Sequence, residues 1–144
     1  MFTNFVSGQL NTSLYHKDCL IIKKNISKRK DVLDVKADRF LEKDQVFIYF
    51  HLEKSDTLNI LLNDSFFKKK YVNVLPDRTG DNPDFSIKLD IKNKAISLTV
   101  YFEKGKSFFR IKIDKKYRVY GIIYHTGMWP NCIYIEKRKY FRFS

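Results

Sequence analysis

Aromatic and hydrogen-bonding side chains alternate with apolar ones in two neighbouring segments of the chain. In Val46–Leu52 the apolar side chains share one face, so Tyr49, His51 and the following Glu53 lie on the other. The same alternation in Thr57–Asn63 leaves the terminal asparagine on the polar face. Aromatic rings stack on the C–H faces of sugars, and planar polar groups bind sugar hydroxyls. This spacing is compatible with carbohydrate binding, and equally with the solvated face of an ordinary antiparallel sheet.

Basic residues alternate with aromatic ones in the C-terminal half of the chain. On a strand, Arg110 and Lys112 would share one face, and Tyr140 and Arg142 another, which places cations beside rings. Such stripes, with a net charge of +12, could bind nucleic acid or a sulfated glycan, or could simply protect edge strands from aggregation. The candidate polyanion-binding residues are Arg110, Lys112, Lys137, Arg138, Lys139 and Arg142.

The sequence lacks the common patterns of catalytic and metal-binding sites. It contains no Gly-x-Ser-x-Gly elbow, no phosphate-binding glycine loop and no His-Glu-x-x-His motif. His16, His51 and His125 lie far apart in the sequence, with no cysteine or carboxylate at ligand spacing. We therefore expect no enzymatic activity, no metal ion and no cofactor.

Length and composition predict one all-β domain spanning residues 1–144. A chain of 144 residues suits a single core. The hydrophobic content of 44% and the aromatic content of 16% exclude a disordered polar chain, and the abundance of β-branched and aromatic residues favours strands. Strands are expected at residues 19–24, 32–37, 46–52, 57–63, 70–74, 85–92, 95–103, 108–114, 119–124, 132–136 and 139–143.

The clearest strand pattern lies between Phe85 and Phe102. Apolar and polar residues alternate up to Asn93 and then resume, which predicts two strands joined by a tight turn as a hairpin.

The cysteines and the N-terminus bear on the compartment. Cys19 and Cys132 are the only cysteines, and two free thiols in a reducing compartment are the default, although the sequence leaves their pairing open. Met1–Leu10 has no apolar stretch of signal-peptide length, and no run of about 20 apolar residues occurs. We therefore expect no transmembrane segment and, by default, a cytoplasmic or nuclear protein.

Several segments, taken in order, resemble the galectin domain. Phe5–Leu10 followed by Cys19–Lys23 is similar to its opening strands, Phe85–Phe102 to its central hairpin, and Ile133–Ser144 to its closing strands. The resemblance covers most of the chain. It implies an all-β fold of two antiparallel sheets packed as a sandwich, a galectin-like jelly roll.

The resemblance also implies a sugar site. Galectins bind β-galactosides on their concave sheet through His-x-Asn-Pro-Arg, Val-x-Asn and Trp-x-x-Glu-x-Arg motifs. His51 and Asn63 match the first histidine and the second asparagine, while Glu53 replaces the first asparagine. The third motif is absent, and Tyr71 is the best replacement for its tryptophan. The carbohydrate-binding residues implied in this way are Tyr49, His51, Glu53, Asn63, Tyr71 and Asn73.

Two functions remain open from the sequence. The resemblance implies a non-enzymatic recognition module that binds a glycan or glycoprotein whose sugar is not simple lactose. It also allows a homodimer formed through a sheet edge, and unconventional secretion. The alternative is a galectin-fold interaction domain that has lost sugar binding. Such a domain would bind a protein or a polyanion, either RNA, DNA or a sulfated glycan, through its basic faces or sheet edges.

Overall fold

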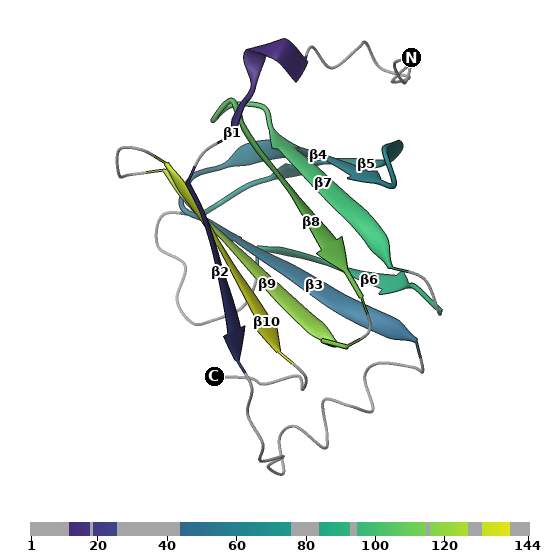
Figure 1. Ribbon diagram of the computed structural model, residues 1–144. Helices are drawn as coiled ribbons and strands as arrows, with labels where there is room; N and C mark the ends of the chain where they lie inside the picture. The colour runs from purple at the N-terminus through teal and green to yellow at the C-terminus, as the bar shows by residue number, and fades with distance from the viewer. Residues whose placement is uncertain are drawn as a thin grey trace.

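Two five-stranded β-sheets face each other in the computed structural model (Figure 1). The structure describes residues 12–17, 19–25, 44–75, 84–92, 95–114, 116–126 and 131–138. Within these ranges the chain contains one short 3-10 turn, η1 (Thr12–Leu14), and no helix long and apolar enough to cross a membrane.

Strands from distant parts of the chain lie side by side in both sheets. Sheet A contains, in spatial order, β1 (His16–Lys17), β8 (Ser107–Ile113), β7 (Ile96–Phe102), β4 (Asp56–Leu62) and β5 (Ser65–Val72). Sheet B contains, in spatial order, β2 (Cys19–Asn25), β10 (Cys132–Arg138), β9 (Val119–His125), β3 (Gln45–Leu52) and β6 (Phe85–Asp90).

The core lies between the sheets, where the inward side chains of the central strands are buried. Phe50 of sheet B and Phe102 of sheet A are fully buried, and Phe102 stacks on Tyr124 with ring centroids 4.1 Å apart. Full burial of one large apolar side chain stabilises a fold by about 1.5–3 kcal/mol. The facing inner surfaces therefore hold the two sheets together.

The all-β, two-sheet sandwich expected from the sequence is confirmed. The sheets are mixed, because three of the eight strand pairings, β1 with β8, β2 with β10 and β3 with β9, are parallel. Nine of the expected strands correspond to β2 through β10, with β5 beginning five residues earlier than expected, at Ser65 instead of Lys70. The strands expected at 32–37 and 139–143 lie outside the described residues.

The predicted hairpin between Phe85 and Phe102 is wrong, although both strands exist. The strand β6 pairs with β3 in sheet B, whereas β7 pairs with β4 and β8 in sheet A. Ile91 N still donates to Asp44 O at 3.0 Å, so the chain follows β3 before it crosses to the other sheet. A hairpin and a crossing between sheets both turn the alternating apolar side chains toward one core, and alternation alone does not distinguish them.

The edge of sheet A at β5 carries lysines on its inward side. Lys68 and Lys70 place their ammonium groups 5.7 and 6.0 Å from the ring centroid of Phe85, which lies on β6 of the other sheet. Charged side chains on an edge strand oppose pairing with another chain.

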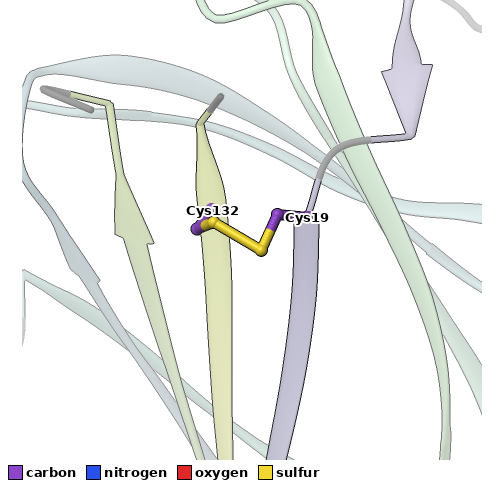
Figure 2. The surroundings of a disulfide bond; sticks show 2 residues. All are labelled: Cys19 and Cys132. Carbon is purple, nitrogen blue, oxygen red and sulfur yellow. A yellow bond between two sulfur atoms is a disulfide. The ribbon is translucent and has the colours of Figure 1, made fainter. Parts of the chain in front are cut away.

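The expectation of two free thiols is wrong, because Cys19 and Cys132 form a disulfide (Figure 2). The two residues are register partners in the parallel ladder of β2 and β10, with Cα atoms 4.5 Å apart. Residues 113 positions apart in the sequence meet there, and only the pairing of these two strands brings them together.

We predict that replacing Cys19 by Ser lowers the free energy of unfolding, measured by urea denaturation. A cross-link that closes a loop of about 100 residues restricts the unfolded chain by up to about 4.7 kcal/mol, and loss of a native disulfide commonly costs about 2–5 kcal/mol. A reductant should lower the stability of the parent protein to the same level and leave the Cys19→Ser variant unchanged. Equal stability of parent and variant without reductant would contradict the prediction.

Candidate functional site

The residues proposed from the galectin resemblance are divided between the two sheets. Tyr49 and His51 lie on the outer face of β3 in sheet B. Tyr71 lies on the outer face of β5 in sheet A, opposite Thr57. The link from β3 to β4 crosses from one sheet to the other at Glu53–Ser55. Outer faces of opposite sheets point away from each other, so the structure does not bring the six residues together in one site.

The sheet B group packs against its own sheet. The Tyr49 ring covers Gly121, where an added Cβ atom would lie 2.3 Å from the tyrosine hydroxyl oxygen, and burial raises the Tyr49 pKa. The ring also meets His51 edge-on, with centroids 5.5 Å apart. Glu53 Oε2 accepts a hydrogen bond from the Thr126 N–H at 2.8 Å. These contacts organise the outer face of sheet B.

The two asparagines organise loops in sheet A. Asn63 has a φ of 51° in the β4–β5 turn, and its Oδ1 accepts a hydrogen bond from Ser97 N at 2.9 Å. Asn73 Oδ1 accepts from Ser55 Oγ at 3.2 Å, and Ser55 Oγ accepts from Val74 N. Both side chains therefore have structural partners.

Tyr71 belongs to a shallow pocket of about 260 Å³ at one end of sheet A. Its side chain is 60% exposed, the highest fraction among the exposed large hydrophobic residues of the described chain. The pocket is lined by Asp56, Thr57, Tyr71, Glu103, Lys104 and Lys106. The first residue of β4, the last exposed ring of β5 and the turn between β7 and β8 thus meet here.

The Glu103 carboxylate is held at a defined position beside Tyr71. Its Oε2 accepts a hydrogen bond from Asn59 Nδ2 at 2.6 Å and lies 3.5 Å from Lys69 Nζ. Asn59 is only 5% exposed, so a buried amide holds this carboxylate on the side that faces the sheet. A fixed carboxylate next to an ammonium group offers both an acceptor and a donor to a ligand hydroxyl.

Asp56 fixes the turn that carries the rest of the pocket. This aspartate is 4% exposed, and its Oδ1 accepts hydrogen bonds from Thr57 N and Lys104 N, both at 2.7 Å. Its Oδ2 accepts a third from Gly105 N at 3.0 Å. A buried carboxylate is tolerated when its oxygens are bonded in this way, and the β7–β8 turn is thereby attached to β4.

The charges of Glu103 and Asp56 act on the neighbouring Tyr15. The pKa of Tyr15 is raised to about 12, first by burial and then by the charges of Glu103 and Asp56. Lys106 places its ammonium group 5.4 Å from the centroid of the same ring. The pocket therefore combines acidic groups at its base with lysines at its rim.

Sequence reasoning missed Lys69 and Glu103, and it did not connect Asn59 with them. The search for a Glu-x-Arg pair assumed that carboxylate and cation lie on one strand, whereas here they come from β5 and from the residue after β7. These residues come together only because β4 pairs with both β5 and β7. The alternation of apolar and polar residues in the sequence does not reveal which strands pair.

The proposed polyanion-binding residues do not form one surface. Arg110 binds Asp64 through two N–H groups, at 2.8 and 3.0 Å. Lys137 lies over the rings of Tyr117 and Tyr120, and Arg138 pairs with Glu136. Lys112 is exposed on β8 of sheet A, whereas Lys137 and Arg138 belong to β10 of sheet B. Lys139 and Arg142 lie outside the described residues.

No protein-family model, curated protein or solved structure matches the chain. In the ranges that the structure describes, no three His, Cys, Asp or Glu side chains are grouped so that they could hold a metal ion.

We predict that Asp56→Asn destabilises the protein, because an amide offers one acceptor oxygen and turns an N–H donor toward the backbone donors of the turn. Hydrogen bonds to a charged group contribute about 1.5–3 kcal/mol each, so we expect a loss of at least about 2 kcal/mol in the free energy of unfolding. Urea denaturation would measure it. Asp90→Asn, at an exposed position on β6, is the matched control and should change little. Equal effects of the two substitutions would contradict this account of Asp56.

Proposed function

We propose that the protein is a non-enzymatic carbohydrate-recognition module that binds a saccharide in the pocket around Tyr71. The observation that supports this most directly is the exposed Tyr71 ring beside a carboxylate that Asn59 and Lys69 hold in place. Carbohydrate recognition is also what the galectin resemblance implies. The residues differ from the motif residues, since only Tyr71 belongs to both sets.

The pocket has the two kinds of group that a sugar requires. The Tyr71 ring can stack against the C–H face of a pyranose, and Glu103 with Lys69 can bind adjacent hydroxyls. A charge-assisted hydrogen bond contributes about 1.5–3 kcal/mol. Ligand pockets commonly enclose about 300–1,000 Å³, so a volume of about 260 Å³, just below that range, suits no more than one sugar unit. We therefore expect weak binding to a terminal residue of a glycan.

Neither carboxylate of the pocket is catalytic in this proposal, since Asp56 holds the turn and Glu103 binds ligand hydroxyls. Asp56 accepts three backbone hydrogen bonds, which occupy both of its oxygens. A glycosidase needs one carboxylate as acid and another as base or nucleophile, each able to reach the glycosidic bond. Asp56 is buried and bonded to backbone, so the pair suits binding.

The disulfide favours an oxidising environment for this function. Disulfides persist outside the cell and in oxidising compartments, and are rare in the cytosol. We therefore propose that the protein acts where extracellular glycans occur, rather than in the cytoplasm or nucleus that the sequence suggested by default.

The experiment is a glycan array followed by calorimetry on the best ligand, with the parent protein and two site variants. Tyr71→Ala should weaken binding about tenfold or more, because stacking on an aromatic ring is lost. Glu103→Gln should have a similar effect, because the charge-assisted acceptor is lost. Tyr71 is exposed, so its replacement leaves the fold intact.

His51→Ala is the matched control, since it removes a ring on the outer face of sheet B. Its binding should equal that of the parent. Loss of binding with His51→Ala and not with Tyr71→Ala would transfer the site to sheet B. Absence of any glycan signal, together with capture of a protein or nucleic acid that Tyr71→Ala does not change, would favour the interaction-domain alternative.

A further inference from the structure

We infer that the saccharide bound at this pocket is acidic, with its sulfate or carboxylate group held between Lys104 and Lys106. This inference rests on the proposed function and specifies the class of its ligand. The observations that carry it are the charges of the pocket, the backbone of Lys106 and the rigidity of the turn.

The acidic side chains of the pocket have hydrogen-bonding partners, whereas the two rim lysines are exposed, with the Lys106 ammonium group over the Tyr15 ring. The oxygens of Asp56 accept three backbone N–H groups, and Glu103 is paired with Lys69 and Asn59. Lys104 and Lys106 are exposed at the rim. The two carboxylates that line the pocket are thus already hydrogen-bonded, whereas the two lysines that line it are exposed at its rim, so the rim favours an anion.

Lys106 occupies a backbone position that is unfavourable for a lysine. Its φ is 54°, in the left-handed region, which is unfavourable for a residue with a Cβ atom. The preceding Gly105 has no room for a side chain, because an added Cβ atom would lie 2.1 Å from the Tyr124 hydroxyl. Lys106 thus keeps a long cationic side chain at a left-handed position, where glycine or asparagine is the ordinary choice, and that side chain lines the pocket.

The turn holds both lysines on a rigid support. Asp56 binds the N–H groups of Lys104 and Gly105, and the Lys106 carbonyl accepts a hydrogen bond from His16 N at 2.8 Å. On its inner side, the Tyr124 hydroxyl donates to Ser107 Oγ at 2.7 Å. A turn fixed at this many points loses little conformational entropy when a ligand binds, which strengthens each contact.

Two other cations of sheet A, Arg110 and Lys69, are less suited to this role. Arg110 is committed to Asp64 and to Ser97 Oγ. Lys69 is paired with Glu103 and is positioned to bind hydroxyls instead. An acidic sugar would therefore stack on Tyr71, place hydroxyls near Glu103 and direct its anionic group toward the β7–β8 turn.

The test compares a chondroitin sulfate tetrasaccharide with its chemically desulfated and carboxyl-reduced form by calorimetry. The parent protein should bind the sulfated, uronate-containing form at least about tenfold more tightly, and the preference should decrease at high salt because exposed charges are screened. The variant Lys104→Gln/Lys106→Gln should lose this preference and retain its affinity for the neutral form. A control, Lys23→Gln/Lys88→Gln, removes the same charge from exposed strands of sheet B and should behave like the parent.

Inorganic sulfate and a single-stranded oligonucleotide distinguish the remaining sources of anionic charge. Either probe should bind at least about tenfold more weakly than the sulfated tetrasaccharide, because neither combines a pyranose with a sulfate group. An oligonucleotide that binds as tightly as the tetrasaccharide, with equal losses in both lysine double variants, would overturn the inference in favour of non-specific attraction.

The two proposals fail in different ways. Equal binding of the neutral and acidic tetrasaccharides, reduced by Tyr71→Ala and not by the Lys104/Lys106 substitutions, would overturn the acidic specificity and support the carbohydrate site. Binding of neither tetrasaccharide, or binding that Tyr71→Ala leaves unchanged, would overturn the site itself and the inference with it.

Discussion

Burial of one face of each sheet against the other is the constraint on which the rest of the structure depends. Every second side chain of the central strands must be apolar and lie between the sheets, as Phe50, Phe102 and Tyr124 do. The remaining positions face outward, and there the chain can place polar and charged groups at little cost. The candidate site is therefore an outer surface, and its residues are those that the core does not require.

Asp56 connects this core to the site. It opens β4, whose Leu58 and Ile60 are fully buried, and its carboxylate holds the turn between β7 and β8. Removing a carboxylate from water is unfavourable, and the three backbone hydrogen bonds offset that cost. The position of the pocket lysines is thus determined by a buried polar contact rather than by the loop alone.

The galectin motif residues and the candidate site have only Tyr71 in common, and the reason is physical. The galectin resemblance implied that the residues of β3, β4 and β5 share one concave sheet, because galectins bind sugars there. In the structure β3 belongs to sheet B, while β4 lies between β5 and β7 in sheet A. Tyr71 consequently meets Glu103, which lies 32 positions later in the sequence, and not His51.

The sequence by itself determined the fold class, the positions of most of the short strands and the inward or outward direction of most side chains. Alternation with a period of two is local, and burial enforces it on each strand separately. Pairing is not local. Only the tertiary structure decided that β6 and β7 lie in different sheets, that Cys19 meets Cys132, and that Asn59 and Lys69 contact the Glu103 carboxylate at one pocket. These outcomes depend on which strands become neighbours, and that choice is made by the fit of all the apolar faces together.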